Sequence, residues 1–228
     1  MSTLHGAGAA QAPGQRVAQP RSHNRQTALL DAAARVFRHN GYAITTMRDI
    51  AAASGMTAGA IYYHYPSKGD LLLAVYREGV RRVTEAVTSA MDAAPAGRRD
   101  DDAWQRLERA VVAHAQMMLA VRPDDAPYAG VFAQVQPYDF PPEHHAALID
   151  LRNGYEAQFR KLLSDLPLRR GVDRRLLRLH LIGALNHMPL WFRADGAKSP
   201  AALARELVRQ LRHATDASVA TARAINPR

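Results

Sequence analysis

Apolar residues along this chain recur at intervals of three and four, the spacing of one face of an α-helix. The pattern is clear from Arg25 to His39, where Leu29, Val36 and Phe37 fall on one side. Similar stretches predict further helices at about 68–91, 103–121, 128–135, 143–166, 172–194 and 199–213. No strand-like alternation persists over five residues. With two short helices described next, the pattern predicts an all-α protein of about nine helices.

The two short helices lie within TTMRDIAAASGMTAGAIYYHYPSK, residues 45–68. Thr46 and Asp49 have the spacing of a capping box, which opens a helix at about 47–53, and Gly55 ends it. Thr57 begins a second helix, and the proline after YYHY stops it. Two short helices joined by a glycine-containing turn are typical of the helix-turn-helix, whose second helix lies in the DNA major groove.

The residue types in this segment suit contact with DNA. Helix 57–64 carries no acidic residue that would repel phosphate, and Ala58 and Gly59 allow close approach. Arg48 can bind guanine edges or a phosphate, and Lys68 is placed to neutralise a phosphate. The predicted DNA-binding residues are Thr46, Arg48, Thr57, Ala58, Gly59, Tyr63, His64 and Lys68.

The segment from about Arg25 to Tyr76, above all TAGAIYYHYPSKGDLLLAV, resembles the N-terminal DNA-binding domain of TetR-family transcriptional regulators. The resemblance covers roughly the first third of the chain, and the rest is similar only in its helical pattern and length. It implies that Tyr62 and Tyr65 face the domain core. Ala58 departs from the family, because many relatives carry a polar or charged residue there, so base readout would depend more on Arg48 and Tyr63.

Composition shifts along the chain suggest its organisation. The stretch APAGRRDDD reads as a loop between two domains, and the first residues have no periodicity and no acidic side chain. The first segment is either a passive tail or an arm that touches DNA. We expect a disordered arm at 1–23, a helix-turn-helix domain at 24–68, a connector helix at 69–94, and a ligand-binding and dimerisation domain at 95–228.

The net charge of +9 favours a polyanionic partner. Seven basic and two acidic side chains fall in residues 1–68, so positive charge is densest where the DNA-binding segment lies. Cysteine is absent, which excludes disulfides and thiolate metal sites. No apolar run approaches the ~18 residues of a membrane span, and the N-terminus lacks the apolar stretch of a signal peptide. These features predict a cytoplasmic protein.

Catalytic and metal-binding signatures are missing from the sequence. HExxH, GxSxG and the Walker lysine loop do not occur. His180 and His187 share a helical face, but no carboxylate or cysteine supports a metal there. We therefore expect no enzyme, no metal and no cofactor, and the stronger rival to a specific regulator is a non-specific DNA-binding protein.

Residues 176–185 are apolar over more than one helical face. Such a helix must be buried on several sides, so we expect the last two helices of two chains to form a four-helix bundle in a homodimer. The resemblance implies the same, because TetR-like proteins use these two helices to dimerise. Two recognition helices would then meet half-sites of a pseudo-palindromic double-stranded operator.

Large or deformable side chains in the middle helices could line an effector cavity. The basic residues near them would suit an amphiphilic anion, and RNGYE…GALNHMPLWFR resembles TetR-family sensors of acyl-coenzyme A thioesters. The sequence thus predicts a repressor released by a small amphiphilic effector, with a multidrug or hydrophobic-compound sensor as the alternative. The predicted ligand-binding residues are Met118, Tyr128, Phe132, Arg152, Tyr155, Phe159, Asn186 and Trp191.

Overall fold

A computed structural model describes residues 21–93, 103–119, 128–129, 131 and 139–218 of the chain. Eight α-helices and one 3-10 helix lie within these residues, with no β-strand among them, which confirms the all-α prediction. Their bounds are α1 Arg21–Asn40, α2 Met47–Ser54, α3 Ala58–His64, α4 Lys68–Asp92, α5 Ala103–Met118, η3 Pro142–His144, α7 His145–Ser164, α8 Arg174–Trp191 and α9 Pro200–Thr215.

Some predicted boundaries differ from those in the structure. Helix α1 begins at Arg21, so residues 21–23 are helical and do not belong to a disordered arm. The helix predicted at 143–166 starts with the 3-10 turn η3, which follows Pro141. The helix predicted at 128–135 is helical at residues 128, 129 and 131, and its other positions lie outside the described residues.

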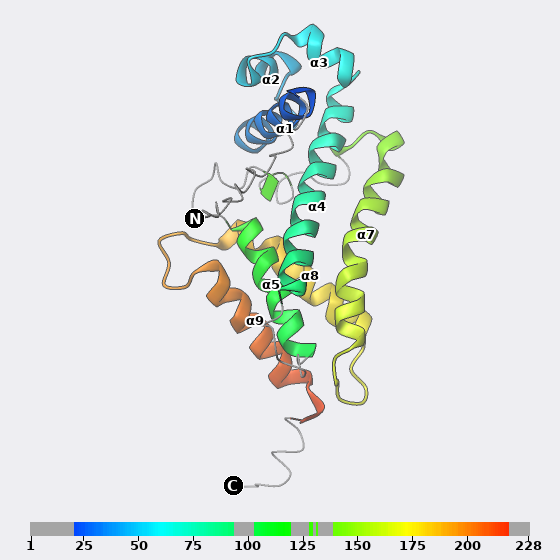
Figure 1. The fold of residues 1–228 in the computed structure, drawn as a ribbon, viewed down its shortest axis with the longest axis vertical. Helices are drawn as coiled ribbons and strands as arrows, with labels where there is room; N and C mark the ends of the chain where they lie inside the picture. The colour runs from blue at the N-terminus through cyan, green and yellow to red at the C-terminus, as the bar shows by residue number, and fades with distance from the viewer. Residues whose placement is uncertain (1–20, 94–102, 120–127, 130, 132–138, 219–228) are drawn as a thin grey trace, which may run out of the picture.

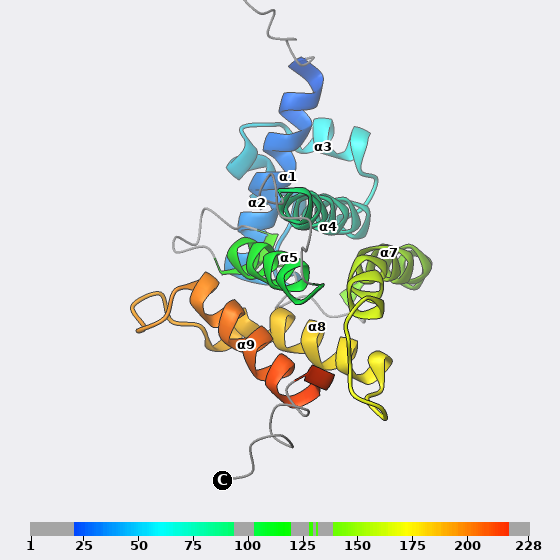
Figure 2. The ribbon, with the colours of Figure 1, turned by 60° about the horizontal axis from the view of Figure 1, so that its bottom comes forward.

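The helices form two groups that share one long helix. Helices α1, α2 and α3 gather at one end of the molecule, and α4 runs from them along its length (Figure 1). Helices α5 and α7 pack on α4, while α8 and α9 pack on α5 and lie on the side of it away from α4 (Figure 2). The connector is therefore in contact with both halves of the protein.

Two hydrophobic cores correspond to the two groups of helices. Leu71 and Val75 of α4 belong to the core of α1–α3, whereas Val83 and Val87 belong to the core built with α5, α7, α8 and α9. Since all four side chains are buried, displacing α4 at one end must strain packing at the other.

Candidate nucleic-acid interface and effector region

Capping bonds hold α2 at a defined angle. The Thr46 hydroxyl accepts from the Asp49 amide at 3.2 Å, and the Asp49 carboxylate accepts from the Thr46 amide at 2.8 Å, which confirms the capping box. Hydrogen bonds from Thr46 hold the pKa of Asp49 below its ordinary value. Gly55 ends the helix at φ 67°, in the left-handed region that favours glycine.

The outward face of α3 is open to solvent and carries no acidic residue. Tyr63 is 85% exposed, and its ring meets that of His64 edge-on at 5.2 Å between centroids. Gly59 is also exposed, with no atom within 4 Å of where a Cβ would stand. Arg48 on α2 is exposed as well. These residues lie at the end of the molecule farthest from α9 (Figure 1), where a DNA duplex could reach them.

Two other residues predicted to contact DNA, Thr57 and Ala58, are partly engaged within the protein. The Thr57 hydroxyl caps the helix by accepting from the Ala60 amide at 3.2 Å, and Ala58 is half-buried.

The expectation that Tyr62 faces the domain core is wrong, because its side chain is 49% exposed. Ile61 and Tyr65, four residues apart, occupy the inward face of this short helix, and Tyr62 is turned about 100° from Ile61. Tyr65 is buried and accepts from Gln26 at 3.0 Å.

Lys68 makes contacts that the sequence did not reveal. Its ammonium donates to the carbonyl oxygens of Tyr42, Ala43 and Thr45 at 2.8, 3.1 and 2.9 Å, and lies 4.4 Å from the centroid of the Tyr42 ring. An ammonium has three N–H donors, and each can reach one of these carbonyl oxygens, which would compete with the phosphate contact that the sequence predicts. Lys68 thus joins the start of α4 to the segment that leads into α2.

A second set of polar contacts, the Asp31 cluster, ties α1 and α4 to Tyr128. Arg82 donates to Asp31 at 2.8 Å and to Glu78 at 2.7 Å, and the Tyr128 hydroxyl donates to the same Asp31 oxygen at 2.7 Å. The guanidinium lies 4.6 Å from the Tyr128 ring centroid. Burial, and then the bond to Asp31, raise the pKa of Tyr128. The cluster therefore joins α1 of the DNA-binding half to residues beyond α5 in the chain.

The first turns of α4 also contact the segment before α7. A Cβ on Gly69 would lie 2.6 Å from Pro141 Cγ, and Nε2 of His144 lies 3.2 Å from an Asp70 oxygen. Tyr76 and Phe140 meet at right angles with centroids 5.7 Å apart. The Ser67 hydroxyl also donates to the Asp70 carboxylate at 2.7 Å and caps α4 by accepting from the Asp70 amide at 3.0 Å, so the beginning of the connector is held from two sides.

The structure gathers only some of the predicted ligand-binding residues. Met118, Tyr155 and Phe159 are buried in the core of α5, α7 and α8. Tyr128 belongs to the other core, beside the DNA-binding helices. Of the remaining positions, Arg152 and Trp191 are exposed, Asn186 is half-buried, and Phe132 lies outside the described residues.

His114 was missed as a site residue, although its place on the apolar stripe of α5 is readable from the sequence. It is buried, and its Nδ1 forms a short hydrogen bond with the hydroxyl of Tyr155. Its Nε2 is buried and has no hydrogen-bond partner among the residues that the structure describes. Burial lowers the pKa of His114 to about 4 and raises that of Tyr155, so both groups are uncharged at neutral pH.

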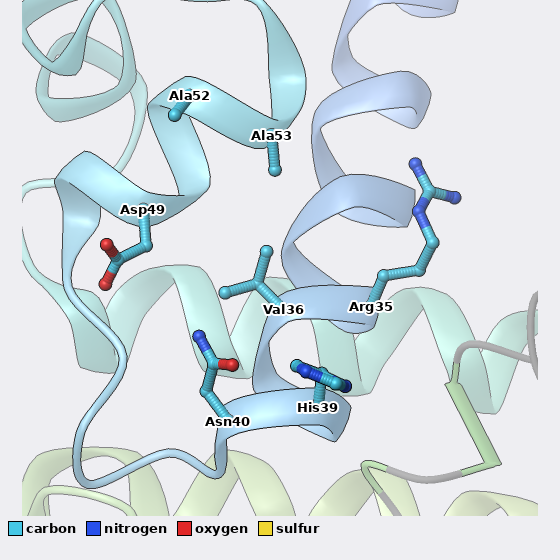
Figure 3. Close-up of a pocket in the computed structure, with 7 residues that line it drawn as sticks. All are labelled: Arg35, Val36, His39, Asn40, Asp49, Ala52 and Ala53. Atoms are coloured by element: carbon cyan, nitrogen blue, oxygen red, sulfur yellow. The ribbon is translucent and has the colours of Figure 1, made fainter.

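A hollow of about 550 Å³ lies elsewhere, on the outer side of α1 and α2 (Figure 3). None of the predicted ligand-binding residues lines it. Arg35 and His39 of α1 stand on one side, and Asp49 and Ala52 of α2 stand on the other. This hollow is open and belongs to the DNA-binding half of the protein.

Helix α8 presents an apolar surface that the described chain leaves uncovered. Leu176, Leu179, Leu190 and Trp191 are each about half exposed or more, at 52%, 49%, 62% and 56%. Gly183 lies on the same helix, and the space where a side chain would begin is open to 4 Å. A helix with large apolar side chains on its solvent face is typical of an interaction surface.

No cluster of three or more histidine, cysteine or acidic side chains suited to a metal occurs in the part of the chain that the structure describes. None of the helices described is both long and apolar enough to cross a membrane.

Comparison with known proteins identifies the class. Residues 29–75 match the profile of bacterial regulatory proteins of the tetR family, and residues 100–215 match that of the tetracyclin repressor-like C-terminal domain. Together the two matches cover most of the chain. The protein belongs to the TetR family of helix-turn-helix transcriptional regulators.

Individual relatives share either the DNA-binding segment or the fold. The HTH-type transcriptional repressor AcnR of Corynebacterium glutamicum is 37% identical over 65 residues, which are 28% of this chain and 35% of AcnR. The match thus spans about a third of that relative's length. Among solved structures, AibR superposes with a TM-score of 0.68 at 23% identity, covering 82% of this chain and 97% of AibR. FadR of Bacillus subtilis gives a TM-score of 0.65 at 20% identity, covering 82% and 97%.

Proposed function

We propose that the protein is a homodimeric repressor that leaves its operator when a small amphiphilic effector binds in the C-terminal half. The observation that carries the proposal is the exposed, acid-free face of α3, held by capping bonds and by Lys68. Tyr63 and His64 on α3 and Arg48 on α2 are the proposed contacts, with backbone positioning by Thr46, Thr57 and Gly59. Such a regulator acts in the cytoplasm, where the DNA is.

DNA binding is tested with an operator selected from random duplexes by the protein itself. Tyr63→Ala should weaken operator affinity about tenfold or more, because an exposed ring lost from a base-reading helix removes contacts worth ~1–3 kcal/mol. Its melting temperature should be unchanged. In ~0.15 M salt the wild type should prefer the operator over unrelated DNA by ~10³ or more, whereas similar affinity for both would identify a non-specific DNA-binding protein.

The proposed dimer uses the exposed apolar surface of α8. Two-fold pairing of α8 and α9 would cover Leu176, Leu179 and Trp191 and set the two recognition helices for half-sites about 34–36 Å apart. Leu179→Glu should give single copies in sedimentation equilibrium and lose operator binding while keeping its helical circular dichroism. Ile149→Glu is the matched control, because Ile149 is 55% exposed on α7, outside that surface. A Leu179→Glu protein that still sediments as a dimer would place the interface elsewhere.

The proposed effector is an acyl-coenzyme A thioester. Two regulators with this fold support that choice, since AibR was solved with isovaleryl coenzyme A and operator DNA, and FadR of Bacillus subtilis with stearoyl-CoA. A cation sensor would use a carboxylate in its cavity, but among the described residues the buried acidic side chain is Asp216, which follows α9 and is paired with Arg212 at 3.0 Å. Titration with butanoyl-, octanoyl- and hexadecanoyl-CoA should release the operator; binding undisturbed by all three at saturation would reject a thioester effector.

Release requires α4 to transmit the change. An effector lodged between α5 and α7 would press on α4, which packs on both, and the Asp31 cluster and Lys68 would carry the displacement to α1 and α2. Affinity for DNA then falls because the two recognition helices no longer match the half-sites, without any contact between effector and DNA.

A further inference from the structure

The crossing of α5 and α7 contains a small polar site inside an apolar core. His114 and Met118 stand one turn apart on α5, and Tyr155 and Phe159 stand one turn apart on α7. The three rings are in mutual contact, with centroid distances of 5.7 Å for His114–Tyr155, 6.2 Å for His114–Phe159 and 5.5 Å for Tyr155–Phe159. All four side chains are at least nine-tenths buried.

The hydrogen bond between His114 and Tyr155 determines which proton lacks a partner. A neutral imidazole carries one N–H, and the phenol carries one O–H. If the Tyr155 hydroxyl donates to Nδ1, the single unmatched group is the Nε2–H of His114. If Nδ1–H donated instead, the phenol proton and the bare Nε2 would both lack partners. The first arrangement leaves fewer polar groups unmet, so we assign Nε2 as a buried donor.

We propose that His114 and Tyr155 form the hydrogen-bonding end of the effector site, where His114 Nε2–H donates to an uncharged oxygen of the effector, a carbonyl or hydroxyl. The inference rests on the proposed function, because it locates recognition within the C-terminal core. A buried donor without an acceptor lowers the stability of the free protein, and a ligand oxygen would remove that cost.

The surroundings select the chemistry of the ligand. Phe159 packs against the His114 ring, and the apolar Met118 lies one turn further along α5, so a carboxylate placed here would lose its hydration. The imidazole itself is neutral, as its burial dictates. An oxygen that accepts a hydrogen bond without bearing charge fits both facts, and Met118 can change rotamer to admit an alkyl chain. In a thioester, the carbonyl joins an apolar chain to a charged group that can remain near solvent.

Two variants separate recognition from a structural role. His114→Leu combined with Tyr155→Phe removes both polar groups, so the free protein should melt at the same temperature as the wild type or higher. A pair that only supports the fold would instead lower the melting temperature when removed. His114→Gln keeps an N–H donor near the position of Nε2 and should retain part of the effector response.

Binding is measured with probe pairs that differ only in the carbonyl: octanoyl-CoA against S-octyl-CoA, and methyl hexyl ketone against octane. The wild type should prefer each carbonyl compound about tenfold, as one charge-free hydrogen bond allows. In the double variant the preference should fall to about one. His114→Gln should lie between them.

The outcomes distinguish this site from the wider proposal. If octanoyl-CoA releases operator equally from the wild type and the double variant, the His114 site is refuted and the thioester effector stands. If the ketone alone binds, with a preference that depends on His114, the site stands and the thioester effector fails. If no carbonyl compound is preferred over its partner, or the double variant melts well below the wild type, the His114 site is refuted.

Discussion

Lys68→Met tests whether this residue positions the recognition helix or contacts DNA. The substitution keeps most of the side-chain stem beside the Tyr42 ring but removes three bonds to carbonyl oxygens, at 2.8, 3.1 and 2.9 Å. A hydrogen bond to a charged group contributes ~1.5–3 kcal/mol, yet water can replace part of this at a half-buried amine. We expect a total loss of about 2–3 kcal/mol, which lowers the melting temperature by roughly 4–12 °C.

Salt dependence of operator binding distinguishes the two roles of Lys68. A lost phosphate contact would reduce the slope of log K against log salt by about 0.9 per protomer. If Lys68 instead holds the segment before α2, the Met variant should bind more weakly at every salt concentration with the slope unchanged. Arg48→Met is the matched control, since Arg48 is exposed on α2 and its loss should leave the melting temperature unaltered. A wild-type melting temperature with a reduced slope in Lys68→Met would refute the structural role.

Three other substitutions probe the connector and the core. Gly69→Ala should lower the free energy of unfolding, measured in urea, by about 1–3 kcal/mol, because the added Cβ would lie 2.6 Å from the rigid ring of Pro141. Gly154→Ala is the control: its Cβ would stand in open space on α7, so the same free energy should rise by roughly 0.5–1 kcal/mol. Arg82→Met should lower the free energy of unfolding by about 1–3 kcal/mol and alter effector-driven release. Arg81→Met is the control, because its partners Glu78 and Glu85 lie on its own helix, and it should change the free energy of unfolding by less than about 0.5 kcal/mol. Equal losses in the two variants would contradict the role of the Asp31 cluster in joining helices. Burial lowers the pKa of His114 from 6.5 to about 4, so on acidification the imidazole is protonated in the unfolded chain before it is protonated in the folded protein. The free energy of unfolding of the wild type should therefore fall by about 3 kcal/mol from this residue as the pH drops from 6.5 to 4. His114→Leu should lack this part of the pH dependence, and parallel stability curves for the two proteins would contradict the prediction.

The parts of the fold that sequence predicts well depend on neighbours in the chain. Thr46 and Asp49 are three residues apart, and Gly55 comes directly after Ser54, the last residue of α2, so both ends of α2 could be predicted to within a residue. Tyr62 was misplaced because a two-turn helix buries only a narrow face, which Ile61 and Tyr65 fill. Resemblance to a family predicts which residue types occur on that helix, but it does not predict how many of them the domain core buries.

Contacts between distant segments account for most of what sequence reasoning missed. Lys68 bonds to carbonyls more than twenty residues earlier, and backbone oxygens leave no trace in the residue pattern. Tyr128 belongs to the core of α1 although it follows α5 in the chain, because α5 packs along α4, which leads back to α1. His114 sits on a stripe that looked simply apolar, and only the position of Tyr155 on another helix shows that one of its nitrogens is left over.

The division of α4 between two cores limits how the protein can be taken apart. Val75 and Val83 are eight residues apart, or about 12 Å along the helix, yet they support different halves. A fragment cut in the middle of α4 would leave Val83 or Val75 without its packing partners. Chimeric regulators that exchange ligand specificity should therefore carry α4 intact, together with whichever residues at Asp31 and Tyr128 it was built to meet.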